Sequence, residues 1–176
     1  MAKPHPKSVH GARRSAARLA AVQTLYSMDL TGMSAVQALD EFRRRQDEEP
    51  QGGMAEEPQG GLAEPDGALV ALLVQGATAE AALLDEMIGR SLSRDWTVDR
   101  LEAVLRAVMR AGAYEIKARP ATPARVAISE YVDVAHAFYA GSEPGLVNAV
   151  LDRIARVLRP EEFDRESGRE PGRDGG

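Results

Sequence analysis

The chain has 176 residues, of which 44% are apolar and only 5% aromatic, so alanine and leucine must supply most of a core. This composition favours helices, because strands prefer β-branched and aromatic side chains. The absence of cysteine excludes disulfides, thiolate metal sites and cysteine nucleophiles. No apolar run approaches the length of a membrane-spanning helix, and the N-terminus has no hydrophobic secretion segment. We therefore expect a soluble cytoplasmic protein with no membrane partner.

The net charge of −5 conceals an uneven distribution. No acidic residue precedes Asp29, whereas the same stretch holds five basic residues: Lys3, Lys7, Arg13, Arg14 and Arg18. A local basic cluster can attract nucleic acid whatever the sign of the whole chain. Residues 1–11 contain two prolines, a glycine and polar residues, which predicts a flexible basic arm.

Apolar residues at helical spacing predict an all-α fold with one helical domain over 12–159. The expected helices cover 12–30, 34–45, 68–92 with a possible bend at Gly76, 98–117, a fifth opening at Thr122-Pro123, and a sixth running from Ser142 and Pro144 to Leu158. The central one, 98–117, buries a broad face and is the helix around which the others pack, with Gly112 allowing a close approach. The repeat QGGMAEEP and QGGLAEPD predicts a flexible acidic loop over about 46–66. Residues 160–176 lack periodicity, which predicts a disordered tail.

Signals for enzymatic chemistry are nearly absent. The three histidines are too scattered for metal-ligand spacing, and no glycine-rich loop stands between a strand and a helix. Asp133 and His136 lie one helical turn apart, which suggests a surface hydrogen bond rather than an acid–base pair. We expect no enzyme, no cofactor and no metal.

The arginines near the N-terminus are the one functional signal with a mechanism. Arg14 and Arg18 are four residues apart and share a helix face, with Arg13 about 100° around the axis. The free N–H groups and partial positive charge of a helix N-terminus suit phosphate oxygens, and arginine also stacks on unpaired bases. Gln23 can read a base edge if it is exposed. The alternative is that these arginines only solubilise an alanine-rich helix, and spacing alone does not decide.

The segment ARRSAARLAAVQTLYSMDLTG resembles the opening of the NusB family of bacterial transcription antitermination factors. Arginines precede an A-x-Q-x-L-Y core, which is matched here by Ala21, Gln23, Leu25 and Tyr26. The likeness continues in LEAVLRAVMRAGAYEIKARP, TPARVAISEYVDVAHAF and LVNAVLDRIARVLRP, in the family's order. Each motif alone is weak, but together they are specific and cover most of the chain.

The resemblance implies a NusB-like bundle of about six to seven helices in two three-helix subdomains. It implies binding of boxA RNA together with the NusE ribosomal protein, within an RNA polymerase antitermination complex that contains other Nus factors. It assigns RNA contacts to Arg13, Arg14 and Arg18, and a partner surface around the central helix. The residues expected on that partner surface are Tyr26, Arg106, Arg110 and Glu115. The last three can equally be members of structural salt bridges, and Tyr26 can equally face the core.

Two departures from the family pattern bear on binding. Leu105 stands where many relatives have an acidic residue, and Gly145 and Leu146 stand where relatives often have Lys-Phe, removing a phosphate contact and a base-stacking ring. A second function therefore stays open: a helical protein–protein interaction module or homodimer whose arginine face meets an acidic partner.

Overall fold

The structure is a computed structural model that describes residues 8–48, 63–93 and 96–167. These residues form helices and connecting segments without a strand, which confirms the all-α prediction. The elements are α1 (Val9–Thr31), α2 (Ala35–Glu48), α3 (Gly67–Ala79), α4 (Ala81–Ser91), the 3-10 turn η1 (Val98–Arg100), α5 (Ala103–Ala118), α6 (Ala124–His136), α7 (Glu143–Leu158) and α8 (Pro160–Ser167).

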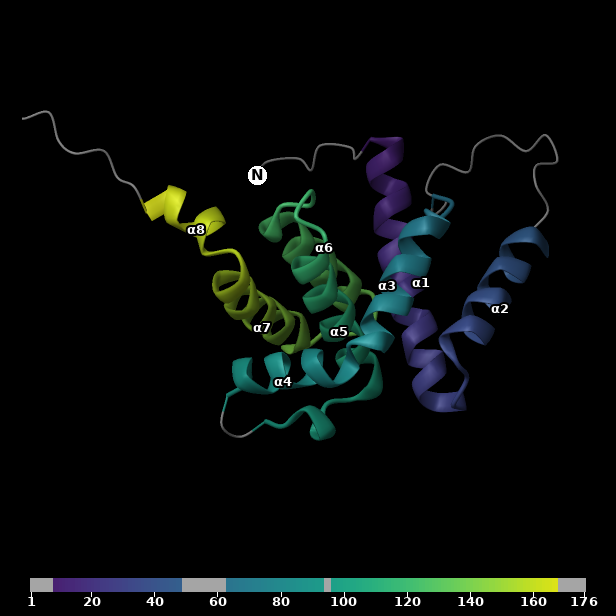
Figure 1. The fold of residues 1–176 in the computed structure, drawn as a ribbon, viewed down its shortest axis with the longest axis horizontal. Coiled ribbons are helices and arrows are strands. Elements are labelled where there is room, and N and C mark those ends of the chain that lie inside the picture. The colour runs from purple at the N-terminus through teal and green to yellow at the C-terminus, as the bar shows by residue number, and fades with distance from the viewer. Residues whose placement is uncertain (1–7, 49–62, 94–95, 168–176) are drawn as a thin grey trace, which may run out of the picture.

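The helices form two packed groups that share α5 (Figure 1). In the first group α1, α2 and α3 pack against one another, and in the second α5, α6 and α7 do so with α4 beside them. The central helix α5 contacts α1, α3, α4, α6 and α7. This agrees with the expected two subdomains, to which the structure adds α4 and α8.

The central helix begins later than its periodicity predicts. Leu101 has extended backbone angles, so η1 ends there and α5 starts at Ala103 rather than at Val98. The predicted close approach at Gly112 is confirmed, because a Cβ atom there would lie 2.7 Å from Cδ1 of Leu151 on α7. A side chain at this position would require the side chains of Leu151 and Tyr131 to shift.

The stretch predicted as one helix over 68–92 is two helices. They meet at Glu80 with a bend of 80°, so the bend is four residues beyond Gly76, which lies inside α3. Within the described residues no single helix is long and apolar enough to cross a membrane, and only the bent pair of α3 and α4, taken together, meets that criterion by length and composition.

Both termini of the described chain are more helical than expected. The Ser8 hydroxyl accepts a hydrogen bond from the Gly11 N–H at 3.2 Å, so α1 begins at Val9 inside the predicted arm. At the other end α8 occupies part of the predicted disordered tail, and its Phe163 is only 5% exposed. The rest of the arm (1–7), most of the duplicated loop (49–62) and the end of the tail (168–176) lie outside the described residues.

Candidate nucleic-acid interface

The first turns of α1 present two of the three predicted RNA-binding arginines. Arg13 is exposed and Arg14 is half-buried. Arg13 is held in place at the helix start: its Nε donates to the carbonyl of Glu64 at 3.3 Å, and its own carbonyl accepts from the Asp66 N–H at 3.2 Å. Among the described carboxylates none forms an ion pair with Arg14, and the first turn of α1 contains no acidic residue. This end of α1 can therefore receive an anion.

Arg18 does not belong to this surface, which corrects the prediction that it contacts RNA. It is 3% exposed, and its Nε and Nη2 form a fork on the Glu115 carboxylate at 2.9 and 2.7 Å. Its Nη1 lies 3.3 Å from Oε2 of Glu130 on α6. The buried side of α1 begins at Ala17, so the face shared with Arg14 turns inward within one helical turn.

Glu115 is fully buried, which also corrects its assignment to a partner surface. Besides Arg18, its carboxylate accepts a hydrogen bond from the Tyr131 hydroxyl at 2.9 Å, and Nη1 of Arg119 lies 3.8 Å away. Helical spacing predicts that Tyr131 is buried, which the structure confirms, but the spacing does not indicate that its hydroxyl meets Glu115 or that Glu130 meets α1. The network joins α1, α5 and α6.

The pKa shifts show how this buried network keeps its charges. Burial lowers the pKa of the Arg18 guanidinium, but the hydrogen bonds and charge of Glu115 outweigh that effect and leave the pKa raised. Burial, followed by the charge of Glu115, raises the pKa of Tyr131 well above its usual value. Tyr131 therefore stays protonated and remains a donor to Glu115.

Arg106 and Arg110 lie where α5 meets the end of α1 and α4. Arg106 Nη2 is 3.1 Å from Oδ2 of Asp29, and Arg110 donates through Nε and Nη2 to the Asp85 carboxylate, both at 2.7 Å. The hydrogen bonds to Asp85 raise the pKa of Arg110. Both arginines thus form ion pairs within the chain, which is the structural role that the sequence left open beside a partner contact. Their side chains remain 22% and 19% exposed. Tyr26 is half-buried and packs against the core.

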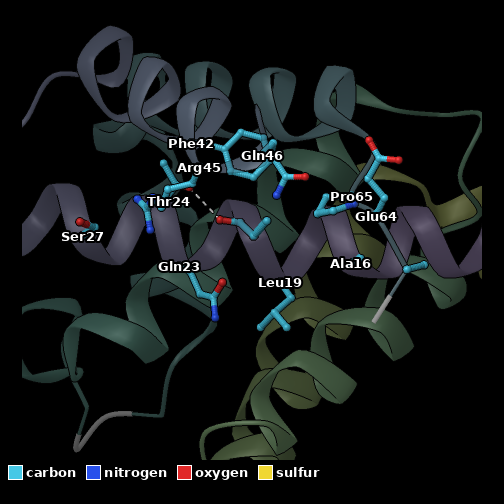
Figure 2. Close-up of a pocket in the computed structure, with 12 residues that line it drawn as sticks. Ala16, Leu19, Gln23, Thr24, Ser27, Phe42, Arg45, Gln46, Glu64 and Pro65 are labelled. Carbon is cyan, nitrogen blue, oxygen red and sulfur yellow. Dashed lines mark hydrogen bonds between the residues drawn. The ribbon is translucent and has the colours of Figure 1, made fainter. Parts of the chain in front are cut away.

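Gln23 is exposed, which is the condition under which base reading was predicted. It lines a pocket of about 480 Å³ between α1, α2 and residues 63–65, shown in Figure 2. On the α2 side the pocket is bordered by Phe42, Arg45 and Gln46. Amide, guanidinium and aromatic groups of α2 thus line the same pocket as Gln23, an arrangement that depends on helix packing and could not be found from spacing.

The remaining candidates add no chemistry. In the part of the chain that the structure describes, no group of three or more His, Asp or Glu side chains is arranged to hold a metal ion. At the start of α7, Gly145 is exposed and Leu146 packs against the core, so the two departures from the Lys-Phe pattern leave no cation or ring there.

Comparison with known proteins gives a consistent assignment. Residues 15–156 match the NusB family model. The chain is 53% identical to transcription antitermination protein NusB of Rhodospirillum rubrum, over 91% of this chain and 92% of that protein, and 47% identical to that of Rhodopseudomonas palustris strain BisB18, over 93% and 94%. T. maritima NusB superposes with a TM-score of 0.66 at 25% identity, covering 86% of this chain and 96% of that one. A chain from the crystal structure of antitermination factors NusB and NusE in complex with dsRNA has the same fold, with a TM-score of 0.62 at 24% identity and coverage of 81% and 96%. The chain belongs to the NusB family.

Proposed function

We propose that this protein is a transcription antitermination factor that binds boxA-type nascent RNA together with the NusE ribosomal protein. In this role it joins RNA polymerase and other Nus factors and supports processive transcription of ribosomal RNA operons. Support comes from the name of its relatives and from a solved complex of the same fold that contains NusE and RNA. Such a factor binds without catalysing a reaction, and it acts in the cytoplasm, where transcripts are made.

The observation that carries the proposal is the basic start of α1. Arg13 and Arg14 follow directly after the first turn of α1, which begins at Val9 and contains no acidic residue. Guanidinium groups and the helix dipole both favour phosphate oxygens. With Arg18 excluded by its burial, the proposed RNA contacts are Arg13, Arg14 and Gln23.

The proposed partner surface lies toward the other end of the same helix. Tyr26 is on the later turns of α1, and Asp29 there pairs with Arg106 on α5. At 1.5 Å per residue, the twelve positions from Arg14 to Tyr26 span about 18 Å. One helix can therefore present RNA contacts near its beginning and protein contacts, with Arg106 and Arg110, near its end.

The test is binding to a single-stranded boxA-type RNA over a salt series, with and without NusE. Arg13→Ala and Arg14→Ala should each weaken binding and reduce the slope of log affinity against log salt by about 0.7 for each phosphate that the protein no longer neutralises. Arg90→Ala is the matched control, because Arg90 is an exposed arginine on α4 and its removal changes the net charge equally. Unchanged affinity and slope in both α1 variants would reject this surface.

Sedimentation of the protein with and without RNA distinguishes the RNA-binding factor from a protein–protein interaction module. A stable dimer that RNA leaves intact, together with weak RNA binding, would favour the helical interaction module whose arginine face meets an acidic partner.

A further inference from the structure

The turns of α1 that carry Arg13 and Arg14 have no apolar anchor of their own. None of the first eight residues of α1, positions 9–16, is buried, and the buried side starts at Ala17. A helix end without buried side chains frays and changes direction easily. The direction of these turns must therefore be set by their polar contacts and by the first buried turn that follows.

Two contacts tie Arg13 to Glu64 and Asp66, and the polar contacts of the next residues along α1 converge on one carboxylate of α6. Ser15, the neighbour of Arg14, donates its hydroxyl to Oε2 of Glu130, and Arg18 Nη1 lies 3.3 Å from the same oxygen. The Glu130 side chain is 13% exposed, so it sits between α1 and α6 rather than in open solvent. One group thus holds two successive turns of α1 against α6.

The fork between Arg18 and Glu115 adds a constraint on rotation. Two parallel N–H···O bonds fix the plane of the guanidinium as well as its distance from the carboxylate. Both side chains are buried, at 4% and 0% exposure, and Tyr131 holds the carboxylate from α6. Since breaking such a pair leaves a buried charge unpaired, α1 cannot rotate about its axis without a large loss of stability.

We propose that Arg18, Glu115 and Glu130 are positioning residues for RNA binding, which aim Arg13 and Arg14 without touching the RNA. The inference rests on the proposed function. In it Arg13 and Arg14 contact RNA, whereas Arg18 only holds the helix that carries them. A surface held in its binding geometry before the ligand arrives loses less conformational freedom on binding, so affinity is higher with no added contact.

Three roles for these residues predict different measurements. Removing a direct contact lowers affinity and reduces the salt slope, because the protein then neutralises one phosphate fewer. A purely structural role lowers stability but leaves the RNA affinity of the folded protein unchanged. Positioning lowers the affinity of the folded protein while the salt slope stays that of the parent.

The matched pair Glu130→Ala and Glu130→Gln isolates geometry from charge. Both remove the same negative charge, but glutamine keeps an oxygen that accepts from Ser15 and Arg18. RNA affinity of the folded fraction should be roughly three- to tenfold lower for alanine than for glutamine, with equal salt slopes. Ser15→Ala should weaken binding in the same direction. Equal affinity of the two Glu130 variants would overturn the proposal.

The second arm replaces the buried pair itself by Arg18→Met with Glu115→Gln, which removes both charges of the fork together. Weaker binding with the parent's salt slope supports positioning, whereas a slope reduced as in Arg14→Ala shows that Arg18 touches RNA and rejects it. Asp85→Ala is the control for affinity measured without NusE. It breaks a two-bond fork between Asp85 on α4 and Arg110 on α5, away from the start of α1, and should leave that affinity unchanged. If Arg13→Ala and Arg14→Ala leave the salt slope unchanged, the proposed RNA surface itself is wrong. If those two variants behave as expected and only the Glu130 and Arg18 variants give results that contradict their predictions, the RNA surface stands and the positioning role alone is rejected.

Discussion

The phenol ring of Tyr114 on α5 occupies the space that a side chain at Gly76 on α3 would need. A Cβ atom at position 76 would lie 1.8 Å from Cζ of Tyr114 and 2.2 Å from its hydroxyl oxygen. The helix continues through Gly76 without interruption, so the glycine serves the packing of α3 on α5 and does not bend the chain.

Gly76→Ala should therefore lower the free energy of unfolding by about 1–3 kcal/mol, although alanine is the better helix former. Urea denaturation measures this directly. Gly145→Ala is the control, because a Cβ there meets no atom within 4 Å and should be neutral or stabilise α7 by up to about 1 kcal/mol. The cost of Gly76→Ala should shrink in a Tyr114→Leu background. An equal cost in both backgrounds would contradict the steric explanation.

Removing one member of the buried fork should be far more damaging than removing both. Glu115→Ala leaves the Arg18 guanidinium buried without its main partner, and we expect a loss of about 3–5 kcal/mol in the free energy of unfolding. Arg18→Met with Glu115→Gln should cost less than Glu115→Ala alone, because glutamine still accepts from Tyr131. Denaturant titration of the two variants in parallel gives the comparison, and a double variant less stable than Glu115→Ala would refute it.

The elements were predictable from the sequence because each helix buries a continuous apolar stripe. The central helix, the start of α7 and the close approach at Gly112 all follow from local spacing. The break at Glu80 was not predictable, since the apolar residues of α3 and α4 run on without a proline between them. Gly76 was the expected place for a bend, but the glycine is there because the Tyr114 ring on another helix leaves no room for a side chain.

The site was predictable only in part, for the same physical reason. Arg14 and Arg18 differ in exposure because α5 and α6 cover α1 from Ala17 onward, and spacing within α1 contains no information about where that cover begins. A charged residue is expected at the surface unless its partner is known. Glu115 lies 97 positions away from Arg18, so the sequence does not identify it as the partner. The tail was only partly predictable: residues 160–176 lack periodicity, yet Pro160 stands at the first position of α8, where a missing N–H costs nothing.

The free energy of unfolding should fall between about pH 10 and pH 12, because the pKa of Tyr139 is higher in the folded than in the unfolded chain. Burial, together with its hydrogen bond to Glu102 at 2.9 Å, raises the pKa of Tyr139 to about 12. The unfolded chain releases this proton near pH 10, whereas the folded chain retains it until about pH 12. Between these values the folded state binds more protons, so raising the pH favours unfolding. Tyr139→Phe should flatten this part of a stability curve measured by denaturation at successive pH values, and an unchanged curve would refute the assignment.

The helix α8 should depend on one aromatic ring. Phe163 is 5% exposed and lies beneath two guanidinium groups, with Arg125 and Arg156 at 5.1 and 4.7 Å from its ring centre. The adjacent Glu162 accepts from the Ala124 N–H at 2.7 Å and from Arg159 at 3.1 Å, which fastens α8 to the start of α6.

Phe163→Ala should release α8 locally before the rest of the fold is affected. The global free energy of unfolding should fall by less than the roughly 3–5 kcal/mol typical of a core phenylalanine, because α8 can detach while α5, α6 and α7 remain packed. Hydrogen exchange measured by mass spectrometry should show faster exchange over 160–167 and unchanged protection over α5. Phe138→Ala is the control, because Phe138 is 40% exposed at the end of α6 and its removal should leave α8 protected. Full protection of 160–167 in Phe163→Ala would mean that Glu162 and the helix itself suffice to hold α8 in place.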